Sequence, residues 1–261
     1  MQLTAEQIQQ NWIQFLGYIN DHITSPRKEK LVEFYEKFED RLILMPAAHK
    51  KEYHNAFPGG YIDHVNRVVK GALHLHDLWG MMGADLSTYT KEELVFAALN
   101  HDLGKMGSEE EESYIPQTDE WRRNKLGENY MFNNKVPFAS VPDRSLFLLQ
   151  SHSIPYSFNE MITIQTHDGL YDEGNKKYLI GFMPEQRPRT SLPFIVHQAD
   201  LMAARIEFEH EWLPKFNLSL DEQKKKYTLE SNKKYPTPSA TKQKALGSVK
   251  SEGLKNLLDN L

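Results

Sequence analysis

Apolar and polar residues alternate along most of this chain with the period of an amphipathic α-helix. Apolar positions recur three and four residues apart, as expected for helices that each bury one face. Three starts carry a capping box, in which Thr4, Thr90 or Ser157 is followed three residues later by glutamine or glutamate. The chain is therefore expected to be all-α, with helices over residues 5–22, 27–44, 60–82, 91–102, 142–152, 158–168 and 191–211.

The helical pattern breaks between residues 105 and 140. This segment begins with an acidic run, and Asn133-Asn134 within residues 130–138 indicates a short β-hairpin. A long irregular insertion inside a compact domain is often a lid or a wall of a binding site. A plain excursion over the surface is the alternative, and the sequence leaves both open.

The composition changes again from residue 221, where lysine, proline, serine and threonine become frequent. Such a stretch buries too little apolar surface to offset its chain entropy. We therefore expect a helical domain over residues 1–220 and a polar tail over 221–261. Four leucines at helical spacing near the end predict a short amphipathic helix, which either folds back on the domain or docks on a protein partner: Leu254, Leu257, Leu258 and Leu261.

The overall composition narrows the class of protein. The chain has 261 residues, 39% of them hydrophobic, a formal net charge of −5 and no cysteine. The negative charge argues against a dedicated nucleic-acid domain and against binding to an anionic membrane. The absence of cysteine excludes disulfides and thiolate zinc sites and favours an intracellular protein. No stretch approaches the roughly 18 apolar residues of a membrane span, so we expect a cytoplasmic protein without a membrane partner.

Histidine and aspartate residues occur in three predicted helices at positions that suit a divalent cation. His64 follows Gly59-Gly60 at the head of one helix, His101-Asp102 ends a nearly continuous apolar run, and Asp200 lies in another apolar helix. An unpaired carboxylate in such surroundings is costly, which favours a cation beside it. Each residue alone is more often an ordinary core or surface residue. Together, nitrogen and oxygen ligands from separate segments suit a metal that keeps positions open for water and substrate.

The elements Gly-Gly-x-x-x-His, His-Asp-x-x-Lys and His-x-x-Asp follow one another in this order within residues 40–210. In this the chain resembles the HD-domain metal-dependent phosphohydrolase superfamily. The resemblance implies an HD-domain helical bundle that holds one divalent ion (Mn, Mg, Co, Zn or Fe), with Lys105 contacting a phosphate. It also implies hydrolysis of a phosphoester or phosphoanhydride bond, with a nucleotide or deoxynucleotide as the favoured phosphorylated substrate. The implied metal ligands are His64, His101, Asp102 and Asp200.

Two further histidines bear on the number of metal ions. Some HD enzymes hold a second metal with additional histidines, for which His152 and His167 are the candidates here. The segment from residue 164 to 169 is similar to the family's Ile-x-x-His-His-Gly, but Asp168 replaces the second histidine. This departure favours one metal, with His167 and Asp168 as catalytic groups that transfer protons or orient water. His197, one turn before Asp200, is expected to support the site or to belong to the core.

Substrate recognition requires positive charge and a surface for the base. Arg67 and Arg144 are candidates for phosphate, and Tyr171 is a candidate for stacking on a base. Residues of these types are more often part of an ordinary surface or loop. His54 resembles a histidine found in HD-type exoribonucleases. Two alternatives therefore stay open: a 3′–5′ exonuclease or phosphodiesterase acting on short oligonucleotides or cyclic nucleotides, and a non-catalytic nucleotide-binding module that acts through its tail.

Overall fold

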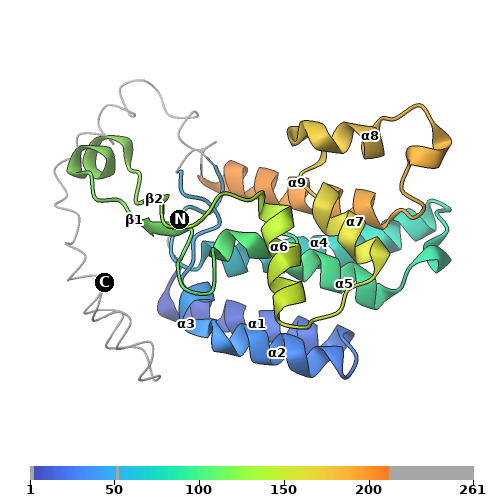
Figure 1. The fold of residues 1–261 in the computed structure, drawn as a ribbon, viewed down its shortest axis with the longest axis horizontal. Coiled ribbons are helices and arrows are strands. Elements are labelled where there is room, and N and C mark those ends of the chain that lie inside the picture. The colour runs from blue at the N-terminus through green and yellow to red at the C-terminus, as the bar shows by residue number, and fades with distance from the viewer. Residues whose placement is uncertain (1–2, 51–52, 212–261) are drawn as a thin grey trace.

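The computed structural model describes residues 3–50 and 53–211, and within these ranges the chain is mostly helical, as the sequence predicts. Two short strands form its small antiparallel sheet, β1 (Tyr114–Pro116) and β2 (Tyr130–Phe132). The helices, shown in Figure 1, are α1 (Ala5–His22), α2 (Arg27–Lys37), α3 (Glu39–Leu42), α4 (Gly60–Met81), α5 (Lys91–Asn100), α6 (Val141–Ser151), α7 (Phe158–Thr166), α8 (Lys176–Leu179) and α9 (Leu192–Glu211).

Helix α4 lies at the centre of the bundle and packs against α1, α5 and α9. Helices α1 and α2 lie along one side of α4 and α5, and α9 lies along the other side (Figure 1). The apolar stripe of α4 is completely buried at Val65, Val68 and Val69. Each such valine contributes roughly 1.5 to 3 kcal/mol relative to an exposed side chain. Because α4 also carries His64, this packing fixes the position of that imidazole within the core.

The helix starts follow the local signals in the sequence. All three predicted capping boxes are present: the hydroxyls of Thr4, Thr90 and Ser157 each accept a hydrogen bond from the third amide of the helix. The helix expected over residues 27–44 is instead interrupted at Phe38, which leaves helical geometry between α2 and α3. The ring of Phe38 is buried there against Phe34 and His152. The interruption of the helix at Phe38 therefore follows from tertiary packing and not from the local sequence pattern.

The insertion between residues 105 and 140 contains a two-stranded sheet, but the predicted position of its turn was wrong. Strand β1 pairs with β2, with Tyr114 opposite Phe132, and residues 117–129 connect them. Asn133 follows β2 and binds across to the acidic segment, where its amide group donates to Glu111 (3.1 Å). Asn133 thus serves as a hydrogen-bonding group at a strand end. The sheet places Tyr114 and Phe132 against His49, so it covers the loop that leads into α4.

Within residues 3–50 and 53–211, no helix is both long enough and apolar enough to cross a membrane. The predicted tail over residues 221–261, its terminal amphipathic helix and the last residues of the predicted 1–220 domain lie outside the described residues.

Candidate metal centre

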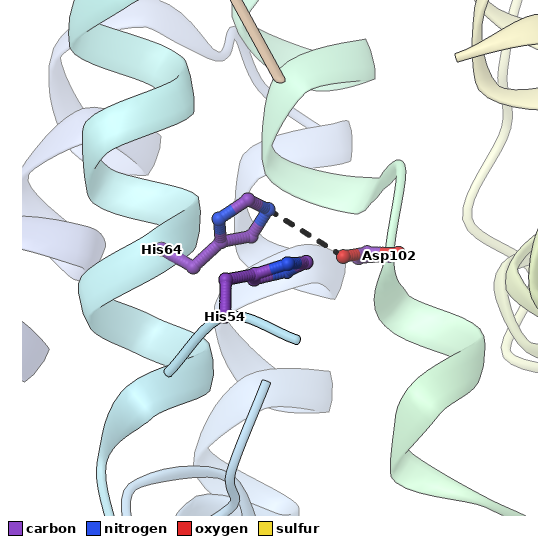
Figure 2. Close-up of side chains that lie close together, drawn as sticks. All are labelled: His54, His64 and Asp102. Atoms are coloured by element: carbon purple, nitrogen blue, oxygen red, sulfur yellow. Dashed lines mark ion pairs between the residues drawn. The ribbon is translucent and has the colours of Figure 1, made fainter. Parts of the chain in front are cut away.

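His64 lies near the start of α4, beside a loop that approaches the helix closely. A side chain at Gly60 would place its Cβ 2.1 Å from the carbonyl oxygen of Asn55, so this approach requires glycine. The same loop carries His54, whose ring centroid is 4.5 Å from that of His64. Figure 2 shows the side chains of His54, His64 and Asp102 directed toward one another. The Gly-Gly pair therefore brings a second imidazole to the site.

His101 and Asp102 follow directly after α5, in a turn that is fastened to α6. The hydroxyl of Ser145 accepts a hydrogen bond from the amide of Gly104 (2.7 Å) and lies 3.2 Å from the carbonyl oxygen of His101. A Cβ on Gly104 would lie 2.2 Å from the carbonyl oxygen of Val141, so α6 approaches because no side chain is present. This contact fixes the backbone of the turn that carries His101 and Asp102.

His167 and Asp200 come from the two remaining helices of the site. His167 follows the last residue of α7, and Asp200 lies within α9. The Nδ1–H of His197, one turn before Asp200, donates to the carbonyl oxygen of His167 (2.7 Å). His197 therefore supports the backbone of His167. Its Nδ1 is occupied by this hydrogen bond and does not face the other side chains of the site.

These side chains converge on one point inside the bundle. The Nε2 atom of His64 lies 3.1 Å from an Asp200 oxygen and 3.6 Å from an Asp102 oxygen. The Nε2 atoms of His101 and His167 lie 3.4 Å and 3.5 Å from Asp102. Groups of three donor atoms within 4.8 Å of one another include all four residues predicted as metal ligands, together with His54, His167 and Asp168.

Each imidazole is oriented by its other nitrogen. The Nδ1–H groups of His101 and His167 donate to the backbone carbonyls of Ala98 (2.8 Å) and Ile164 (2.7 Å). With a hydrogen on Nδ1, the Nε2 of each ring in its neutral form would offer a lone pair to a cation, as in most metal-bound histidines. Among the residues that the structure describes, the buried Nε2 atoms of His64 and His101 have no hydrogen-bond partner. Leaving such an atom unpaired costs roughly 1 to 3 kcal/mol, so the residues present fit a divalent cation.

The charges within the cluster reinforce this fit. Desolvation lowers the pKa of His64, but Glu207 and Asp200 outweigh it and raise this pKa to about 10. Desolvation also opposes the charge on His167, while Asp102 raises the pKa of His167 to about 9. The pKa of Asp200 is lowered, because the nearby imidazoles of His64, His101 and His167 together outweigh desolvation. A divalent cation would take the place of these protons, so its binding would release them to solvent.

Lys105 lies next to the cluster, one turn after Asp102. Its largely buried ammonium is 2.5 Å from an Asp102 oxygen. Desolvation lowers the pKa of Lys105, but the Asp102 carboxylate raises it by more, so the side chain stays protonated. A permanent positive charge therefore borders the candidate metal position.

Sequence reasoning missed Glu207, which lies two turns after Asp200 on the same face of α9. Its carboxylate is almost completely buried and lies 3.1 Å from Nδ1 of His64. It also accepts a hydrogen bond from Nε of Arg67 (3.2 Å). A carboxylate spaced seven residues from Asp200 in a largely apolar helix was the signal that could have found it. Glu207 holds the His64 imidazole in the same way that backbone carbonyls hold the other two.

Three residues that were predicted to bind substrate, Arg67, Arg144 and Tyr171, do not join the cluster of predicted metal ligands. Arg67 donates hydrogen bonds to Glu207 and Asp63. Because Glu207 holds the imidazole of His64, Arg67 supports His64 indirectly. Arg144 donates to the carbonyl oxygen of Gly104 (3.3 Å) and to that of a proline in the insertion. Tyr171 is 83% exposed in the segment after α7. The structure thus brings together the predicted metal ligands but not these three predicted substrate groups.

His152, one of the two candidates for a second metal, lies apart from the cluster. Its ring packs edge-on against Phe34, and its Nε2 is 3.2 Å from a Glu109 oxygen. The other candidate, His167, does lie in the cluster and forms a group with Asp168 and Asp200. A second metal would therefore involve His167 and not His152.

Comparisons with protein-family models, with curated proteins and with solved structures found no match to this chain. Its function must therefore be inferred from the side chains themselves.

Proposed function

We propose that this chain is a metal-dependent phosphohydrolase of the HD superfamily that cleaves a phosphoester or phosphoanhydride bond of a nucleotide or deoxynucleotide. The proposal rests on the convergence of two histidines and two aspartates from three separate segments, with buried imidazole nitrogens that lack partners within the described part of the chain. The ammonium of Lys105 beside them supports phosphate as the group recognised. The four residues that would hold the ion are His64, His101, Asp102 and Asp200.

This donor set suits a first-row divalent ion or magnesium, because imidazole and carboxylate groups serve Zn, Fe, Co and Mn, and carboxylate groups serve Mg. When bound, such an ion supplies Lewis acidity toward a phosphoryl oxygen and lowers the pKa of a bound water. The protein supplies the orientation: hydrogen bonds donated by the Nδ1–H groups of His64, His101 and His167 keep each Nε2 directed inward.

The remaining groups act on the substrate and on protons. Lys105 neutralises negative charge that develops on the phosphoryl oxygens. Asp168 lies 3.7 Å from Nε2 of His167, and its side chain is 46% exposed. This pair therefore connects the buried cluster with solvent, and it accepts a proton from the attacking water or delivers one to the leaving oxygen.

A substrate screen tests the proposal. The purified protein is incubated with nucleotides and deoxynucleotides in the presence of Mn²⁺, Mg²⁺, Co²⁺, Zn²⁺ or Fe²⁺, and released phosphate is measured. We expect saturable turnover that Asp102→Ala abolishes and that His152→Ala, as the matched control, retains. Metal and nucleotide binding without turnover would contradict the proposal and favour a non-catalytic binding module.

A second candidate function is cleavage of short oligonucleotides or cyclic nucleotides. The observation that favours it is the position of His54 beside His64, because its buried Nε2 lacks a hydrogen-bond partner among residues 3–50 and 53–211. The insertion also exposes Trp121 (60%) and Phe132 (54%), and such aromatic faces can stack on bases of a single strand. Assays on mononucleotides, cyclic nucleotides and oligonucleotides of increasing length, with the same metals, distinguish the two candidates.

A further inference from the structure

A cavity of about 570 Å³ lies outside the candidate metal centre. One wall consists of Phe158 and Ile162 from α7 together with Pro193 from α9. Most of the remaining lining comes from Lys177 and Tyr178 of α8 and from residues 185–190 of the segment that follows it. In Figure 1 this segment forms an excursion beside α7 and α9. The volume falls within the range of about 300 to 1,000 Å³ that is typical of small-molecule sites.

The charge around this cavity is predominantly positive. Lys177, Arg187 and Arg189 line it, and Glu185 is the one acidic residue among the lining side chains that the structure describes. Within the part of the chain that the structure describes, none of these three cations forms an ion pair with a carboxylate. Nε of Arg187 donates to the carbonyl of Gly181 (3.1 Å), which leaves the outer edge of its guanidinium available. Such an edge binds phosphate oxygens in pairs.

Aromatic rings complete the lining. Tyr178 faces the cavity from α8, and Phe158 faces it from the start of α7 with 73% of its surface exposed. A large exposed aromatic ring beside unpaired guanidinium groups fits a ligand that carries both a flat apolar ring and negative charge. We propose that this cavity is a second binding site for a nucleotide, separate from the metal centre, with the phosphate held by Arg187 and Arg189 and the base stacked on Phe158 or Tyr178.

The two sites are joined through two helices. Helix α7 contributes Phe158 to the cavity and ends directly before His167, and α9 contributes Pro193 to the cavity and carries Asp200. The nine steps along the helix from Phe158 to His167 correspond to about 13.5 Å along its axis. A nucleotide in the cavity would therefore contact α7 and α9, the helices that position His167 and Asp200. Its binding site is nevertheless separate from the metal centre.

Calorimetric titration of the full-length protein tests the site without turnover. The titrations use AMP, GMP, CMP, UMP, adenosine and inorganic phosphate in the presence of EDTA, so that hydrolysis at a metal cannot interfere. We expect saturable binding of at least one nucleotide, at least tenfold tighter than that of adenosine or of inorganic phosphate. The double variant Arg187→Ala/Arg189→Ala should weaken this binding at least tenfold, and Asp102→Ala should leave it within twofold of the wild type.

A matched pair of lysines provides the control. Lys177 lines the cavity, whereas its neighbour Lys176 is paired with Glu173 (2.7 Å) and does not line it. Lys177→Ala should weaken nucleotide binding at least threefold, while Lys176→Ala should not change it. No saturable binding up to millimolar concentration, equal effects of the two lysine variants, or loss of binding in Asp102→Ala would each overturn the proposal. These outcomes are independent of phosphatase activity, so they test the cavity and not the proposed reaction.

Discussion

Three imidazoles of the candidate metal centre, those of His64, His101 and His167, share one arrangement, in which each is held by the nitrogen that faces away from the cluster. Two of the acceptors are backbone carbonyls, at Ala98 and Ile164, which substitution cannot remove. The third is the side chain of Glu207, which binds His64. A carboxylate in this position fixes the tautomer and makes the imidazole a stronger ligand. Glu207 therefore offers a direct test of how orientation contributes to metal affinity.

Glu207→Gln should weaken metal binding by about 10- to 100-fold, the usual effect of losing such a support. The amide keeps the size of the side chain but not its charge, so His64 is less firmly held and less basic. Competition with a metal-sensitive dye measures the affinity. Glu209→Gln is the matched control on α9, because Glu209 is exposed and pairs only with Arg205 among the described residues. Equal affinities in both variants would show that Glu207 has a purely structural role.

Lys105→Ala should keep the metal bound but lower turnover by roughly two to three powers of ten, as expected for the loss of one charge-stabilising group. The ammonium contacts Asp102 but offers no lone pair to a metal, because it stays protonated. Lys105→Arg should restore substrate binding more than rate, since a planar guanidinium has a different geometry. Metal content and steady-state kinetics on the best substrate measure these effects. Wild-type turnover in Lys105→Ala would exclude a role in phosphate chemistry.

The two histidines considered for a second metal should behave differently. His152→Ala should retain activity and metal content, because that side chain packs on Phe34 and pairs with Glu109. His167→Ala should lose activity while one metal per chain remains. Metal analysis by mass spectrometry, together with kinetics, checks both variants. A loss of one metal equivalent in His167→Ala alone would indicate a dinuclear centre built on His167, Asp168 and Asp200.

At the scale of secondary-structure elements, one arginine connects the helices α2, α5 and α7. Arg27 at the start of α2 lies 2.5 Å from Glu92 on α5 and 2.7 Å from Glu160 on α7. Its guanidinium also lies over the ring of Phe96, 4.3 Å from the centroid. Glu160 is completely buried and belongs to the capping box of α7. The orientation of α7, and with it the position of His167, therefore depends on this contact.

Arg27→Ala should lower the free energy of unfolding by about 3 to 5 kcal/mol at pH 7, because it leaves Glu160 as an unpaired buried charge. Desolvation raises the pKa of Glu160, and Arg27 opposes that rise. Without Arg27 this pKa rises further, so Glu160 takes up a proton more readily as the pH falls. The stability difference between variant and wild type should therefore be largest near neutral pH and shrink toward pH 4.

Urea denaturation of both proteins between pH 4 and pH 7.5 measures this difference. The double variant Arg27→Ala/Glu160→Gln is the control: it removes the charge that Arg27→Ala strands, so it should recover part of the lost stability at neutral pH. A stability difference that does not change with pH would show that Arg27 acts through packing on Phe96 alone.

On the scale of the whole molecule, the cluster joins segments that are far apart in the sequence. His64 comes from α4, Asp102 from the turn after α5, and Asp200 from α9. An ion bound to all three would link these elements, and the unfolded chain offers no such preformed site. Metal binding should therefore stabilise the native state.

Removal of metal with EDTA should lower the melting temperature, and saturating metal should raise it. At a free metal concentration 1,000 times the dissociation constant, the gain in unfolding free energy is about 4 kcal/mol. Differential scanning calorimetry with and without the chelator measures the shift. Asp102→Ala should abolish the metal dependence. Identical melting curves for the wild type with and without metal would argue against a metal centre at this position.

The sequence by itself determined the features that depend on near neighbours. The capping hydroxyls of Thr4, Thr90 and Ser157 mark real helix starts, because a capping box needs only residues three positions apart. The helical period identified the all-α class for the same reason. The candidate ligands were identifiable because His101-Asp102 ends an apolar run, where a carboxylate is costly without a partner.

Only the tertiary structure decided the features that depend on contacts between distant segments. The pairing of β1 with β2 joins residues on either side of a long connection, so the Asn-Asn signal misplaced the turn. Glu207 became part of the site through its contact with His64, which is 143 positions away in the sequence. His152 lies against Phe34 because α6 ends beside α2. Such contacts follow from how whole helices pack, and no local pattern encodes which faces will meet.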